Sequence, residues 1–228
     1  MKKFELTTEF ITNMFGKKLF RIKALVEFGN VKAGELGGYV EKEENVSQDG
    51  NAWVSGDARV YGDAEVSGDA RVSGNAEVSG NARVYGDAEV SGDARVSGNA
   101  EVYGDAWVSG NARVYGNAWV SGNAEVYGDA WVSGNARVSG NARVYGNARV
   151  SSDADYALVQ GFGTEFRCTT FYRGKNKKIM VNCGCFHGDL EGFRKQVKET
   201  RNGKIAKEYL MIADLMEYHF TSEDSSNE

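Results

Sequence analysis

A six-residue repeat dominates the chain and restricts its fold more than any other feature. From Asn51 the pattern Asn/Asp-Ala-x-Val-Ser/Tyr-Gly recurs seventeen times, and the last copy ends at Ser152. Residues two apart on a strand point to the same face, so each Ala-x-Val predicts a short strand with alanine and valine inward and x outward. Glycine followed by Asn or Asp predicts a corner, because these residue types tolerate positive φ at least cost. A period of six residues is typical of β-helices.

The outward residues predict how many sides the helix has. Over the first half of the array they alternate strictly in charge: Arg59, Glu65, Arg71, Glu77, Arg83, Glu89, Arg95, Glu101. With two or four repeats per coil, each charge would stack on its own sign about 4.8 Å away, which is unfavourable. With three repeats per coil, neighbours are eighteen residues apart and opposite in sign, as for Arg71 and Glu89. The sequence therefore predicts a mainly β protein built on a three-sided parallel β-helix.

The segments on either side of the repeats differ from them in composition. We divide the chain into an N-terminal cap over 1–38, the parallel β-helix over 39–156, a C-terminal α+β unit over 157–220 and a disordered tail over 221–228. In the cap we expect strands at Lys18–Glu27 and Val31–Lys32, joined by a turn at Gly29 and Asn30. Val40 and Val46 keep the six-residue spacing but Val54 comes eight residues later, which predicts two extra residues in the first coil.

The C-terminal unit has the pattern of two strands followed by two helices. Glu165–Arg173 and Lys177–Phe186 predict the strands. Asp189 can cap the first helix, and a second helix should follow Asn202 and Gly203. This ββαα unit is small for an independent core, so we expect it to pack on the last coil or on a second chain.

Composition narrows the function classes. The 27 basic and 32 acidic residues give a net charge of -5 with no basic stripe, which argues against a nucleic-acid partner. No apolar run is long enough for a membrane span or a signal peptide. Three cysteines, an odd number near the C-terminus, indicate a reducing compartment. We expect a cytoplasmic protein with no membrane partner.

Two groups of outward residues are candidates for binding a partner. Tryptophans interrupt the charge alternation, and three arginines form a basic collar around the last coil: Trp107, Trp119, Trp131, Arg137, Arg143, Arg149. Exposed tryptophan and arginine are enriched in binding hot spots. Steps of twelve residues, however, place the tryptophans on three different faces. Stacking on neighbouring arginines, as for Trp131 between Arg113 and Arg149, is the structural alternative.

A zinc site near the C-terminus can also be weighed. Cys183, Cys185 and His187 alternate along one expected strand, and Cys168 could lie on its partner. Residues two apart on a strand stand nearly 7 Å from each other, whereas thiolates on one zinc each lie about 2.3 Å from the metal. A core strand with cysteine as a small apolar filler fits better. We expect no metal and no cofactor.

The repeat Val-x-Gly-Asn/Asp-Ala-x resembles the hexapeptide repeat of left-handed β-helix proteins, which include an acyltransferase superfamily and non-enzymatic relatives. The resemblance covers about 100 residues. It implies a left-handed coil. The flanking segments Arg21–Leu25 and Gly37–Asn45 look like those of phage and prophage proteins of this class, which are labelled acyltransferases or polymer-forming proteins.

These observations favour a protein that is not an enzyme. The acyltransferases of this fold use a histidine base in a cleft between prisms of a trimer, but the repeats here contain no histidine, and His187 and His219 follow them. We expect a non-catalytic structural or protein-interaction protein of phage or prophage origin in a bacterial host, and one version is an inhibitor of a host defence complex. Its partner would be a host or phage protein, with homo-oligomers through the C-terminal unit or the prism faces. The alternatives are an acyltransferase-like trimeric enzyme and a polymer-forming scaffold.

Overall fold

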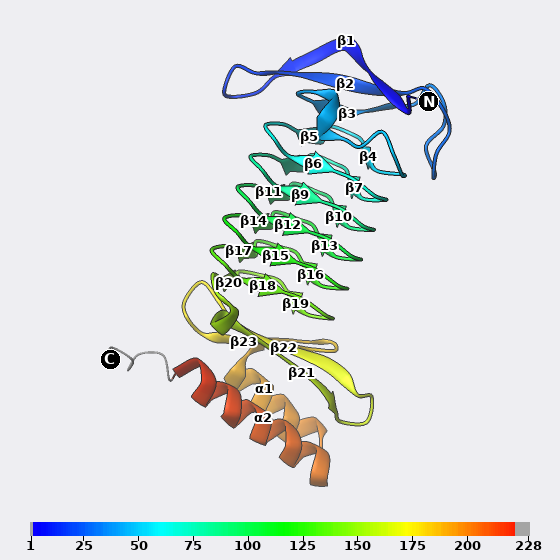
Figure 1. Ribbon diagram of the computed structural model, residues 1–228. Coiled ribbons are helices and arrows are strands. Elements are labelled where there is room, and N and C mark those ends of the chain that lie inside the picture. The colour runs from blue at the N-terminus through cyan, green and yellow to red at the C-terminus, as the bar shows by residue number, and fades with distance from the viewer. Residues whose placement is uncertain (1, 222–228) are drawn as a thin grey trace.

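The computed structural model describes residues 2–221 and shows a rod with a cap at each end (Figure 1). The rod is a parallel β-solenoid of about six turns with three parallel sheets, so the predicted three-sided β-helix is confirmed. The first sheet contains β3 (Leu36–Val40), β5 (Arg59–Val60), β8 (Glu77–Val78), β11 (Arg95–Val96), β14 (Arg113–Val114), β17 (Trp131–Val132) and β20 (Arg149–Val150). The second contains β4 (Trp53–Val54), β7 (Arg71–Val72), β10 (Glu89–Val90), β13 (Trp107–Val108), β16 (Glu125–Val126) and β19 (Arg143–Val144). The third contains β6 (Glu65–Val66), β9 (Arg83–Val84), β12 (Glu101–Val102), β15 (Trp119–Val120) and β18 (Arg137–Val138).

The pairing along the rod has the register that the charge alternation predicts. Arg71 pairs with Glu89, eighteen residues on, and Arg95 meets Arg113 as the one expected like-sign pair. Inside the rod, the alanine and valine of every repeat are fully buried or within 1% of it. Backbone hydrogen bonds join each coil to the next, for example from Arg83 N to Ala100 O at 2.9 Å. Burial of small side chains and a continuous backbone ladder therefore hold the rod together.

At each corner of the rod, glycine and the polar residue that follows it have different roles. The repeat glycines adopt positive φ, for example +71° at Gly98. Among the described residues only Phe166 and Lys177 do so without being glycine, so the expected positive φ at Asn and Asp is wrong. The asparagines instead stack in a ladder of amide hydrogen bonds, as from Asn81 to Asn99 at 3.0 Å. This ladder adds a side-chain contact to the backbone bond that these residues already make with the next coil, as from Asn81 N to Gly98 O at 2.8 Å.

The N-terminal cap is an antiparallel pair laid beside the first solenoid sheet. β1 (Phe4–Thr12) pairs with β2 (Lys18–Ala24), and β2 pairs with β3, which then enters the parallel ladder. The expected hairpin at Gly29 is wrong, since only one isolated bridge, Phe28 to Val31, forms there. β1 was missed. A short 3-10 helix, Glu43–Asn45, follows β3, and the proposed boundary at residue 38 falls inside β3.

The two extra residues of the first coil are in the expected place. Val46 bridges to Val66, twenty residues away, whereas Val54 pairs with Val72, eighteen away. The insertion between them lets Lys3 and Gln48 cross-link the cap to the coil: Gln48 Oε1 accepts from Lys3 N at 2.7 Å. The first coil therefore carries the contacts that fasten the N-terminal cap.

The C-terminal cap is a four-stranded antiparallel sheet backed by two helices. A 3-10 turn, Asp153–Asp155, leads into the elements β21 (Tyr156–Phe162), β22 (Arg167–Arg173), β23 (Ile179–Cys183), β24 (Phe186–Asp189), α1 (Leu190–Thr200) and α2 (Gly203–Thr221). The expected ββαα unit thus lacks two strands that the structure has, and Tyr156, where we ended the solenoid, begins β21. Asp189 caps α1 as predicted, accepting from Gly192 N at 2.9 Å.

This sheet has one face on the rod and the other on the helices. Tyr172 belongs to the core of the rod, whereas its neighbour Phe171 packs with Val181 and the helices in a separate core. Figure 1 shows the helices on the far side of the sheet from the solenoid. Between residues 2 and 221 neither helix has the length and apolar character to cross a membrane. Thr221, the first residue of the predicted tail, is instead the last residue of α2, and the rest of that tail, 222–228, lies outside the described residues.

Candidate functional site

The three tryptophans proposed for partner binding lie on three different sheets, in β13, β15 and β17. Trp131 is held between two arginines of its own sheet, with Arg113 at 5.1 Å and Arg149 at 4.0 Å from the ring centroid. The guanidinium carbon of Arg137 lies 4.8 Å from the ring centroid of Trp119. Trp107 donates from Nε1 to Ser91 Oγ at 3.3 Å. These rings pack along the rod, and they form no common platform.

The collar arginines also occupy three sheets and are engaged by the coil before them. Arg143 pairs with Glu125 at 3.1 Å. Arg149 donates from Nη1 to the carbonyl oxygens of Ala148 and Asp129 at 2.7 and 3.0 Å. The six proposed residues therefore make neighbouring contacts within each sheet, and the structure does not bring them together into one site.

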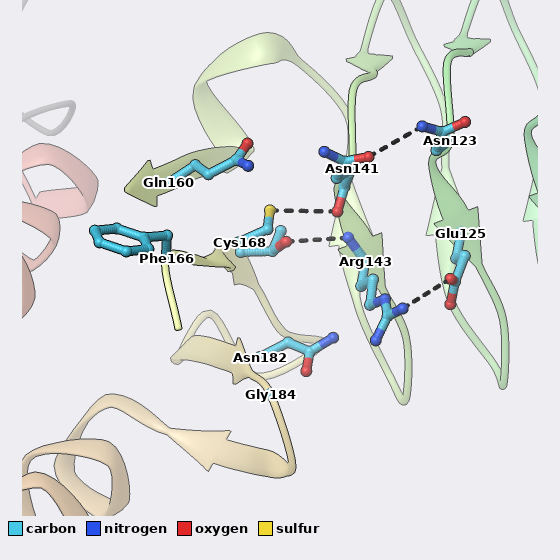
Figure 2. A pocket seen from close by; sticks show the side chains of 10 residues that line it. Asn123, Glu125, Asn141, Arg143, Gln160, Phe166, Cys168, Asn182 and Gly184 are labelled. Carbon is cyan, nitrogen blue, oxygen red and sulfur yellow. Dashed lines mark hydrogen bonds and ion pairs between the residues drawn. The ribbon is translucent and has the colours of Figure 1, made fainter. Parts of the chain in front are cut away.

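A cavity of about 360 Å³ lies where Arg143 meets the C-terminal sheet (Figure 2). Its polar groups bond mostly to one another. Asn123 donates to Asn141 Oδ1 at 3.1 Å, and the Cys168 thiol donates to Asn141 O at 3.3 Å. Burial raises the pKa of Cys168, which keeps its sulfur protonated and weakens it as a nucleophile. The cavity joins the rod to its cap, and these groups do not form a nucleophile and base pair.

One histidine lies closer to the solenoid than we expected. The ring centroid of His187 is 3.9 Å from that of Tyr145 on the last coil, and its Nδ1 is 3.4 Å from Tyr172 Oη. The repeats themselves contain no histidine, but the C-terminal sheet places His187 against their last coil. Desolvation lowers the pKa of His187, which favours the neutral imidazole at pH 7.

The cysteines are divided between two sides of the C-terminal sheet. Cys168 contacts the rod, whereas Cys183 packs with the helix-side core and accepts from Thr169 Oγ1 at 3.1 Å. Cys185 is exposed. Within residues 2–221 no group of three histidine, cysteine or acidic side chains is placed to hold a metal ion.

The most exposed large apolar side chains lie in the two caps, which sequence reasoning missed. Met14 and Phe15, at the tip of the β1–β2 hairpin, are 86% and 70% exposed. Met211, Leu215 and Tyr218 on α2 are 61%, 58% and 72% exposed. On the described solenoid strands the highest value for such a residue is 47%, at Trp107. The signals were present, as an apolar pair before Gly16 in a turn and an i, i+4, i+7 pattern on α2.

The repeats, the two-residue strands and the three parallel sheets define a parallel β-solenoid of the hexapeptide-repeat class. The model of the YdcK beta solenoid repeat family matches the chain, and every match lies in the rod: 76–92, 94–110, 106–122, 130–144 and 136–154. These parts of the rod are therefore similar to repeats of that β-solenoid family, whereas the N-terminal cap and the chain from β21 onward lie outside the matched residues. A comparison with curated proteins gave no match.

Proposed function

We propose that this protein is a non-catalytic protein-interaction rod whose caps hold the binding surfaces and whose solenoid separates them. One observation carries the proposal: large apolar side chains more than half exposed occur at the cap surfaces and not on the described solenoid strands. Exposed apolar clusters on soluble proteins mark interaction sites. We assign the partner-binding surface to the tip of the β1–β2 hairpin, which holds Met14 and Phe15. This hairpin projects at the N-terminal end of the rod (Figure 1).

The partner in this proposal is a host or phage protein in the bacterial cytoplasm, and the rod acts as an inhibitor of a host defence complex. Support comes from the resemblance of Arg21–Leu25 and Gly37–Asn45 to phage and prophage proteins. A plating assay tests this version. Expression of the chain should raise the plating efficiency of phage on strains that carry a defence system, and Phe15→Ser should abolish the gain. Equal plating with and without the protein would reject it.

Affinity capture from a bacterial lysate tests the surface itself. The full chain should retain a defined protein, and the double variant Met14→Ser, Phe15→Ser should lose it, because apolar contact area at the tip is removed. Trp107→Ser is the matched control, since it removes a larger exposed ring from the rod, and it should retain the partner. If the tip variant captures the same protein, the hairpin is not the binding surface.

A second candidate, an acyltransferase-like trimeric enzyme, is favoured by the position of His187 against the last coil. Against it, the strand ladder from β5 to β20 continues without an inserted loop. Calorimetry with acetyl-CoA and mass in solution separate the two. A trimer that binds acetyl-CoA, with binding lost in His187→Ala, would replace the interaction proposal. A polymer-forming scaffold fits less well, because a cap covers each end of the rod where coils would stack.

A further inference from the structure

Two cysteines lie on either side of one glycine at a tight turn of the C-terminal sheet. β23 ends at Cys183 and β24 begins at Phe186, and these two residues pair across the strands. The turn between them therefore has only two central residues, Gly184 at φ +60° and Cys185. Residues two apart in a straight strand are at most about 6.8 Å apart, and a chain that reverses its direction brings them closer. The two cysteines are thus within the roughly 4.4–6.8 Å between Cα atoms that a disulfide spans.

Both of these cysteines lie on the helix side of the sheet. Cys183 packs with the core to which Phe193 of α1 belongs. Cys183 and Cys185 together line a cavity of about 270 Å³ that also includes Phe193. The third cysteine is directed the other way: Figure 2 shows Cys168 facing the rod, where its thiol donates to Asn141 O. The fold therefore groups two thiols on one side of the sheet and keeps the third apart from them.

The two grouped thiols differ in their access to solvent. Cys185 is exposed, so that a dissolved reagent reaches its sulfur. Cys183 is half-buried, and its sulfur accepts a hydrogen bond from Thr169 Oγ1 at 3.1 Å. The rate at which a thiol attacks a disulfide depends on access as well as on its own chemistry. Cys185 is therefore placed to react first with a dissolved disulfide, and Cys183 to react second, from within the turn.

We propose that Cys183 and Cys185 are a reactive dithiol, at which a low-molecular-weight disulfide such as oxidised glutathione closes a bridge across Gly184. In the first step the Cys185 thiolate attacks one glutathione sulfur, the S–S bond of glutathione breaks, and one glutathione leaves as its thiolate. In the second step the Cys183 thiolate attacks the Cys185 sulfur of the mixed disulfide and releases the second glutathione. The two cysteines lose two electrons and two protons, and one oxidised glutathione becomes two reduced molecules.

This redox site goes beyond the interaction function proposed above and does not depend on it. The hairpin tip with Met14 and Phe15 is at the other end of the rod (Figure 1). A bridge between residues two apart closes a small ring, and strained or exposed disulfides are the ones that are readily reduced again. The bridge across Gly184 therefore forms and opens with the supply of oxidant, as regulatory disulfides do.

Peptide mass spectrometry of the full chain tests the bridge. Reduced protein is incubated with oxidised glutathione, the remaining thiols are blocked with iodoacetamide, and the chain is cut with trypsin. Cleavage after Lys178 and after Arg194 leaves Cys183 and Cys185 in one peptide, and the basic residues before it put Cys168 in another. We expect the peptide with two cysteines to stay unblocked and to be lighter by two hydrogen atoms than its reduced form. Dithiothreitol should restore the reduced mass.

Three serine variants separate the steps of the exchange. Cys183→Ser removes the second step and should keep one glutathione on Cys185. Cys185→Ser removes the exposed thiol, so its remaining thiol of the pair should react about tenfold more slowly or less. Cys168→Ser is the matched control and should form the bridge as the wild type does. Three results with the wild-type chain would each overturn the proposal: a bridge to Cys168, glutathione that stays on Cys185, or complete blocking of the pair by iodoacetamide in an excess of oxidised glutathione.

Discussion

The solenoid and the C-terminal cap stabilise their folds in different ways. From Ala58 to Val150 the buried residues of the solenoid are all alanine or valine, and the same backbone ladder repeats from coil to coil. In the cap a few large side chains interlock once: Phe193 meets Phe171 and Tyr209 at right angles, with centroids 6.0 and 5.9 Å apart. A single substitution in the rod removes one contact and leaves the equivalent contacts of the other coils in place. In the cap, no other residue replaces a large ring that is removed. The cap should therefore be more sensitive to single truncations.

The outward-facing side chains of the rod and the exposed side chains of the caps also differ in how many neighbours they contact. On the rod, every position has a neighbour one coil away, so Glu77 accepts from Tyr61 and Glu101 accepts from Tyr85. Burial, together with these contacts, raises the pKa of Tyr61 and of Tyr85 to about 12. On the caps, Phe15 and Leu215 have no coil beyond them. A side chain on the repeats contacts its equivalents in neighbouring coils, whereas a side chain beyond the last repeat has no such neighbour, and this is why we propose interaction surfaces at the ends of the rod.

The largest effect is expected where the two regions join. Tyr172 is fully buried in the rod core and the adjacent Phe171 is fully buried in the helix-side core. Truncation of either ring to alanine should cost about 3–5 kcal/mol of unfolding free energy. Hydrogen exchange separates them: Tyr172→Ala should expose the last coil, and Phe171→Ala should expose α1 and α2. Identical exchange patterns would mean that rod and cap share one core.

A glycine pair compares the rod with the N-terminal cap. Gly98 and Gly16 have similar φ, +71° and +76°. A Cβ at Gly98 would lie 3.0 Å from the backbone of Gly116 one coil away, whereas at Gly16 it would meet nothing within 4 Å. Gly16→Ala should therefore cost only the left-handed backbone term, about 1 kcal/mol. Gly98→Ala adds a steric clash and should cost about 3 kcal/mol. Urea unfolding measures the loss of unfolding free energy in both variants. Equal losses would show that the close contact between coils does not restrict the side chain at position 98.

The rod could be predicted almost completely from the sequence, because each of its parts is a local pattern. The valine spacing set the strands, and the signs of Arg71 and Glu89 set the pairing. The caps could not. β24 is four residues long and holds Gly188, and β21 ends in Gly161 and Phe162, so neither has a clear strand pattern. Both form because the open last coil supplies a surface for the sheet, which is a tertiary effect.

The candidate site was predicted less well than the fold. The three faces of Trp107, Trp119 and Trp131 follow from arithmetic on the repeat. The repeat spacing also gave the stacking alternative for Trp131, and the structure has it between Arg113 and Arg149, with Arg149 at 4.0 Å. Exposure of Met14 and Phe15, in contrast, depends on how the β1–β2 turn sits relative to the rod. That position is not encoded in a local pattern.

A buried lysine gives the N-terminal cap a pH dependence. Lys3 is 3% exposed, its Nζ donates to Ala52 O at 3.0 Å, and burial lowers its pKa from 10.5 to about 8. Between those values the unfolded chain binds the proton and the folded chain does not, so stability rises with pH across the window 8 to 10.5. The slope is at most about 1.4 kcal/mol per pH unit.

The variant Lys3→Met isolates this effect, since tyrosine ionisation affects both proteins alike. Chemical unfolding of wild type and variant at several pH values should show the difference in unfolding free energy moving in favour of wild type from pH 8 to 10.5. Parallel profiles would show that the ammonium is not desolvated in the folded cap.

The smallest expected effect comes from a comparison of two corners of the rod. One corner stacks asparagines, with Asn99 donating to Asn117 Oδ1 at 3.0 Å. Another stacks Asp69, Asp87 and Asp105 at the same eighteen-residue spacing. Like charges directly opposite one another destabilise a sheet, whereas an amide between two carboxylates can donate to one of them, as Asn75 does to Asp93 at 2.9 Å. Asp87→Asn should therefore stabilise the rod by about 0.5–1 kcal/mol.

The gain in stability of Asp87→Asn should shrink in high salt, because salt screens the repulsion that the substitution removes. Thermal unfolding at low and high ionic strength measures it, with Asp57→Asn at the end of the alternating corner as the control. A loss of stability in Asp87→Asn at low salt would mean that the three carboxylates do not repel, and that this acidic corner is neutralised by something other than the chain.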